Sequence, residues 1–99
     1  MRPYRNLKIA SLIQQELNKL IFRNLDLNGA LVTITEVEVL EDLKEAKVKV
    51  SILPNDKVLE IFNLLENNRR ELQFQLIRKM NIRPIPHLKF VLQEEKLAT

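Results

Sequence analysis

Several reactive residue types are missing, or nearly missing, from this 99-residue chain. It contains no cysteine, which excludes disulfide bonds and thiolate chemistry and fits a protein of the reducing cytosol. The only histidine, His87, cannot form a metal-binding cluster or a Cys–His pair. The only glycine, Gly29, excludes a glycine-rich loop for phosphate. There is no serine nucleophile elbow either, so the residues support neither an enzyme nor a cofactor.

The chain also lacks a long hydrophobic run. No apolar segment approaches the roughly 20 residues that a membrane-spanning helix needs. The N-terminus is basic but no apolar segment follows it, so we expect no signal peptide. The length indicates one domain, and the apolar fraction of 45% can supply a small core. Because the net charge is only +3, any argument for nucleic-acid binding depends on where the 16 basic residues lie.

Alternating residues between 37 and 51 predict an antiparallel β-hairpin. In its second strand, residues 44–53, apolar side chains alternate with mostly polar ones, which is typical of a strand with one buried face. Residues 40–44 are short and polar enough for the connecting loop. The first strand, residues 30–40, changes its inward parity near Thr35–Glu36, which predicts a β-bulge there.

Three stretches have the apolar spacing of amphipathic helices. The first covers residues 4–24 and should end before residues 26–29, because Asn and Gly tolerate the positive φ that ends a helix. The second begins after residue 55 or 56, since either Asn55 or Asp56 can cap it. Two consecutive asparagines, Asn67 and Asn68, predict a break.

A third helix should follow this break and cover residues 69–81, with Asn68 and Glu71 as a capping box. Prolines then stop the helix, and a last strand covers residues 87–93. The predicted order is α-β-β-α-α-β, an α+β two-layer sandwich with three helices on one face of a three-stranded sheet. We expect one domain over residues 1–93 and a frayed tail over residues 94–99.

This order is the topology of a type II KH domain, and the local patterns resemble a narrower family, ribosome-binding factor A. The resemblance extends from about Arg5 to Phe90 and depends on the order and spacing of its motifs together. The matching segments are Val32–Thr35, Val37–Val39, Asp42–Leu43, Ala46, Val48–Ser51 and Arg83–Phe90.

The resemblance implies a non-catalytic, cytoplasmic factor that binds free small ribosomal subunits through rRNA and assists late rRNA maturation. It implies a monomer with no cofactor, no membrane association and no small-molecule substrate. Two features depart from the family. Its members usually continue past the last strand with a charged tail, and they have a small residue, typically Ala, where this chain has Asn67–Asn68. The alternative is a KH-like module that binds a protein through a strand edge and does not bind RNA.

A KH domain usually clamps a single strand with a Gly-x-x-Gly loop between paired helices. Here the only glycine precedes the first strand, so RNA binding would need another chemistry. The first candidate is the start of the third helix, where a helix N-terminus can attract phosphate. Side-chain donors there would come from Asn67, Asn68, Arg69 and Arg70.

Two further basic groups are candidates for phosphate contacts. The first lies on one arc of the first helix and consists of Arg2, Arg5, Lys8, Lys19 and Arg23. The second consists of Arg78, Lys79 and Arg83. Ordinary solvated helix faces explain both groups as well, and Arg78 could pair locally with Glu71 or Gln75.

The aromatic residues give no support for a base-stacking platform of the RRM or OB type. Tyr4 is the only tyrosine, and the four phenylalanines are mostly at positions expected to pack in the core. We therefore expect specificity to come from the shape of the RNA.

Overall fold

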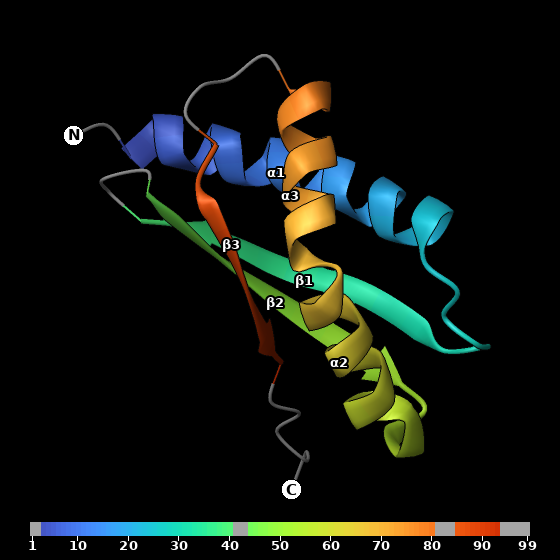
Figure 1. Ribbon diagram of the computed structural model, residues 1–99. Helices are drawn as coiled ribbons and strands as arrows, with labels where there is room; N and C mark the ends of the chain where they lie inside the picture. The colour runs from blue at the N-terminus through green and yellow to red at the C-terminus, as the bar shows by residue number, and fades with distance from the viewer. Residues whose placement is uncertain (1–2, 41–43, 81–84, 94–99) are drawn as a thin grey trace, which may run out of the picture.

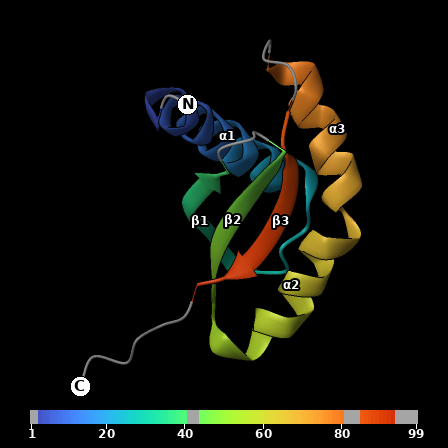
Figure 2. The ribbon, with the colours of Figure 1, turned by 90° about the vertical axis from the view of Figure 1, so that its left-hand side faces the viewer.

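The computed structural model describes residues 3–40, 44–80 and 85–93, and its elements follow the predicted order (Figure 1). They are α1 (Pro3–Asn24), β1 (Leu31–Val39), β2 (Glu45–Leu53), the short 3-10 helix η1 (Asn55–Lys57), α2 (Val58–Asn67), α3 (Arg69–Lys79) and β3 (His87–Leu92). The helices form one layer and the sheet forms the other, as the two views show (Figure 2). The predicted α+β sandwich with type II KH order is therefore confirmed. In the part of the chain that is described, no helix is long and apolar enough to cross a membrane.

The sheet is mixed and has the strand order β1-β2-β3. Strands β1 and β2 pair antiparallel as the predicted hairpin, and β3 joins the other side of β2 in parallel. The register of β1 against β2 shifts between Ile34 and Glu36, which confirms the predicted bulge at Thr35. Because of this extra residue, Ile34 and Val37 both face the helices although their parities differ.

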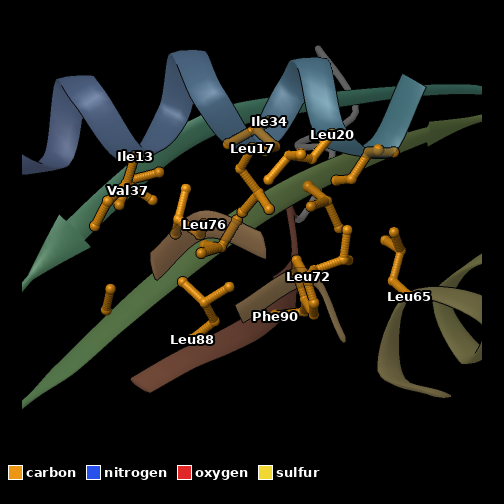
Figure 3. Close-up of a cluster of buried hydrophobic side chains, with 14 of the residues drawn as sticks. Ile13, Leu17, Leu20, Ile34, Val37, Leu65, Leu72, Leu76, Leu88 and Phe90 are labelled. Atoms are coloured by element: carbon orange, nitrogen blue, oxygen red, sulfur yellow. The ribbon is translucent and has the colours of Figure 1, made fainter. Parts of the chain in front are cut away.

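The hydrophobic core lies between the helices and one face of the sheet (Figure 3). Ile13 and Leu17 of α1, Val48 of β2, and Leu72 and Leu76 of α3 are essentially inaccessible to solvent. The other face of the sheet is open, and its side chains are mostly polar. The helical layer is thus fixed by core packing, and its outer surface is available for contacts.

Helix α1 ends before residues 26–29, as predicted, but the positive φ values expected to end the helix occur only in the turn that follows it. The helix ends at Asn24, and two residues of the following turn have positive φ, Asn28 at 51° and Gly29 at 82°.

The predicted helix caps are wrong. Neither Asn55 nor Asp56 caps α2; its N-cap is Lys57, which makes no side-chain capping bond, and the two predicted residues belong to η1. Asn68 precedes α3 but does not form a capping box with Glu71. Its Nδ2 instead donates to the Leu64 carbonyl oxygen at 2.8 Å, because α2 ends one residue earlier and its last carbonyls are within reach.

Two predicted ends differ from the structure or lie outside it. Helix α3 ends at Lys79, before the predicted Asn81, because Met80 is already extended, with ψ at 136°. The hairpin loop residues 41–43, the segment 81–84 and the tail 94–99 lie outside the described residues.

Candidate nucleic-acid interface

The basic residues of α1 lie on the side of the helix that faces away from the core. Lys8, Lys19 and Arg23 are exposed, whereas Ile13 and Leu17 on the opposite side are buried. From Lys8 to Arg23 the group extends about 22 Å along the helix axis. We call these three residues the α1 basic stripe. Leu12 lies between them on the helical wheel; it is half-buried and packs against the edge of the core.

Only one ion pair involves the α1 basic stripe within the described residues. The Lys19 ammonium lies 3.4 Å from a carboxylate oxygen of Glu16, and the Lys19 side chain is 59% exposed. An ion pair this exposed contributes less than about 1 kcal/mol to stability. Glu16 therefore competes only weakly with another anion for Lys19. Arg5 lies within α1, but its side chain is outside the described part, as is all of Arg2.

The start of α3 retains only part of the predicted site. The Asn68 side-chain amide already donates a hydrogen bond to the Leu64 carbonyl oxygen. The Arg69 guanidinium lies 3.6 Å from a carboxylate oxygen of Glu66. Asn67 and Arg70 are exposed, and neither forms an ion pair or side-chain hydrogen bond with another described residue. The C-terminal dipole of α2 lies one residue away and offsets the positive N-terminus of α3. At the start of α3, phosphate would therefore be bound by side chains and not by the helix N-terminus, and chiefly by the side chain of Arg70.

The second half of α3 carries the third predicted group. Arg78 and Lys79 are exposed, while Arg83 lies outside the described residues. Arg78 does not pair with Glu71, which accepts a hydrogen bond of 2.9 Å from the Gln75 amide. The Arg78 guanidinium carbon lies instead 5.8 Å from the centre of the Phe74 ring. A shallow hollow of about 260 Å³ lies beside these residues and is lined by Glu71, Gln75, Arg78 and Lys79.

The structure brings α1 and α3 together at one junction. The Asn24 amide of α1 donates to the Gln75 side-chain oxygen of α3 at 3.2 Å, and Figure 1 shows α3 crossing α1. Arg23 adjoins Asn24 in sequence, and Arg78 follows Gln75 by about one turn. Arg23 of α1 and Arg78 of α3 therefore both lie near this junction. Arg70 lies farther away, about 12 Å from Arg78 along α3.

The phenylalanines do not all pack as the sequence predicts. Phe90 is buried and Phe62 is partly buried, but Phe22 is 82% exposed and Phe74 is 54% exposed. The sequence contains a signal for Phe74, because it lies four residues after Arg70 and four before Arg78 and so shares a helix face with both.

The open face of the sheet has a different charge pattern. Lys47, Lys49 and Lys89 lie there among Glu36 and Glu38 of β1. Lys49 pairs with Glu36 at 3.1 Å, and Lys47 is the cross-strand neighbour of Glu38. Glutamates of β1 lie opposite lysines of β2 here, so this face is a poorer surface for a polyanion than the outer side of α1.

The fold and these surfaces define a KH-like domain of type II order with basic residues on its helices and no Gly-x-x-Gly clamp. Comparisons with known proteins narrow this class. A family model described as ribosome-binding factor A matches residues 5–97. The chain therefore belongs to the ribosome-binding factor A family.

Individual relatives agree with this membership. The ribosome-binding factor A of Nitrosospira multiformis is 41% identical over 93 residues, which cover 91% of this chain and 73% of that protein. The relative from Prochlorococcus marinus is 37% identical over 89 residues, which cover 86% of this chain and 68% of that protein.

Solved structures show the same fold. The crystal structure of ribosome-binding factor A from Thermus thermophilus has a TM-score of 0.73 at 20% identity, covering 88% of this chain and 94% of that one. A homology model of the Thermus thermophilus factor, fitted into a cryo-EM map of a 30S–RbfA complex, has a TM-score of 0.68 at 23% identity, with 83% and 88% covered.

Proposed function

We propose that this protein binds the free small ribosomal subunit through rRNA in the cytoplasm and assists late rRNA maturation as a non-catalytic, monomeric factor. The observation that carries the proposal is the exposed cations on the helical layer. Lys8, Arg23, Arg70 and Lys79 have no carboxylate partner among the described residues. Family membership and the 30S–RbfA map of the Thermus thermophilus factor support the choice of the small subunit as partner.

The mechanism that we propose is occupancy of one RNA conformation. Cations along α1 and α3 contact phosphates and release counterions, which supplies affinity without reading base sequence. The rigid packing of both helices on the sheet fixes the spacing of these cations, so the shape of the RNA determines the fit. The factor stabilises that shape while the rRNA matures and leaves when the mature subunit no longer presents it.

Sedimentation with purified small subunits tests the proposal. We expect the protein to sediment with the subunits at about 50 mM salt and to dissociate markedly by about 200 mM, because phosphate contacts weaken steeply with salt. No association at the lower salt would contradict the proposed function. Association that does not respond to salt would contradict the phosphate mechanism alone.

One observation favours the alternative of a protein-binding module. Among the described residues, the Gln73 side chain covers the start of the outer edge of β3 and bonds there to the Pro86 oxygen at 2.7 Å and to the Leu88 nitrogen at 2.9 Å. Further along, the backbone groups of Phe90 face this edge, since alternate residues of a parallel strand pair with β2. Arg70→Glu separates the functions, because RNA binding should weaken while pairing of an extended segment with β3 should not change.

A further inference from the structure

Three residues form a continuous stripe on the outer face of α3. Arg70, Phe74 and Arg78 follow one another at four-residue spacing, so they lie above one another on one side of the helix. This side is opposite the buried residues Leu72 and Leu76. We call these three residues the α3 outer stripe. It places an exposed aromatic ring between two arginines.

The ring of Phe74 is held in a defined environment although it is exposed. Arg78 lies over the ring at 5.8 Å from its centre, which is within the range of a cation–π contact. The ring still has 54% of its surface accessible to solvent. No element of the described fold covers it, so an incoming flat group can reach it.

The two arginines are free to bind an anion. Neither lies within ion-pair distance of a carboxylate among the described residues. The nearest acidic residue in sequence, Glu71, already accepts a hydrogen bond from Gln75. Arg78 also lines the hollow that extends toward Lys79, so cationic groups continue beyond the ring.

We propose that the α3 outer stripe binds an unpaired nucleotide of RNA, with the base stacked on Phe74 and the neighbouring phosphates held by Arg70 and Arg78. This inference rests on the proposed function and adds a specific contact to it. Every base has a π-face that can stack on an aromatic ring, and the flanking cations favour a polyanion over a neutral partner. The site would select single-stranded or bulged RNA, because a base inside a duplex cannot reach the ring.

Substitutions at Phe74 test the stacking. Phe74→Ala and Phe74→Leu should each weaken binding to small subunits at about 50 mM salt by roughly tenfold or more, because neither residue has a ring. Phe74→Trp should bind at least as tightly as the original protein. The salt dependence of Phe74→Ala should stay unchanged, since no cation is lost, whereas Arg78→Gln should reduce it.

Leu59→Ala is the matched control, because Leu59 is an apolar side chain that is 75% exposed on α2 and lies outside the basic groups of α1 and α3. It should bind like the original protein, and circular dichroism should show that all variants are folded. Unchanged binding by Phe74→Ala, or full binding by Phe74→Leu, would overturn the inference and leave the proposed function intact. If the original protein fails to bind subunits, the proposed function falls and this inference with it.

A photoreactive benzoylphenylalanine in place of Phe74 identifies what lies against the stripe. Crosslinks to nucleotides of the small-subunit rRNA are the expected result. Crosslinks confined to a ribosomal protein would show that the stripe docks a protein, and would overturn the inference even if Phe74→Ala weakens binding.

Discussion

At the scale of single residues, burial in this protein follows the periodicity of the sequence closely. Leu17 faces the core and is completely buried, while Leu7, on the same helix, is 70% exposed. The three- and four-residue spacing of α1 predicts this difference, because it assigns each side chain to a helix face. Exposed phenylalanines are less predictable from hydrophobicity alone, and Phe74 becomes understandable only from its spacing to the arginines.

Leu17 and Leu7 provide a matched test of the core. Leu17→Ala should lower the free energy of unfolding by about 2–5 kcal/mol, because it removes buried methyl groups and leaves a cavity. Leu7→Ala should change it by less than about 0.5 kcal/mol. Chemical denaturation monitored by circular dichroism measures both, and equal effects would contradict the described packing of α1.

The two asparagines at the helix break, Asn67 and Asn68, should contribute differently to the stability of the fold. Asn68→Ala should destabilise the fold by about 1 kcal/mol, because it removes the 2.8 Å bond to the Leu64 oxygen at the end of α2. Asn67→Ala should have little effect on stability, since the exposed Asn67 makes no such bond. Thermal unfolding of both variants decides the point; a larger loss for Asn67→Ala would show that the roles are reversed.

The sequence predicts the break at these asparagines but not the partner of Asn68. A capping box and a bond back to the preceding helix use the same residue type at the same position. Which one forms depends on whether the preceding carbonyls are within reach, and that follows from how directly α2 leads into α3.

At the scale of elements, the hairpin, the bulge and the three helices can all be read from local patterns. The parallel pairing of β3 with β2 cannot be read from local patterns, because it depends on contacts between residues about 40 positions apart. The order of the elements predicts a three-stranded sheet, but it does not predict the place of β3 in that sheet. The contact that joins α3 to β3, made by Gln73, has no local signal at all.

Gln73 should therefore be important for the attachment of β3. Gln73→Ala should lower the free energy of unfolding by about 1–3 kcal/mol, because the Pro86 oxygen and the Leu88 nitrogen both lose a partner. Hydrogen exchange at the Leu88 amide should become faster. Gln15→Ala, at an exposed position on α1, is the control and should change neither quantity.

At the scale of the whole molecule, the distribution of charge matters more than its total. The net charge of +3 is small, yet the two faces differ. The helical layer carries cations without carboxylate partners among the described residues, while on the sheet face glutamates of β1 lie opposite lysines of β2. Helical periodicity predicts which cations share a face of α1, but the junction of Asn24 with Gln75 that brings α1 and α3 together could not be foreseen.

Binding to small subunits, measured as a function of salt for two charge-reversal variants, tests this account most directly. The first variant replaces Lys8, Lys19 and Arg23 by Glu, and the second replaces the exposed sheet residues Lys47 and Lys89 by Glu. We predict that the first variant binds at least roughly tenfold more weakly with a clearly smaller salt dependence, because phosphate contacts are lost. The second should retain most of the affinity and the full salt dependence. Equal losses for both variants, or a larger loss for the sheet variant, would contradict the assignment of RNA binding to the helical layer.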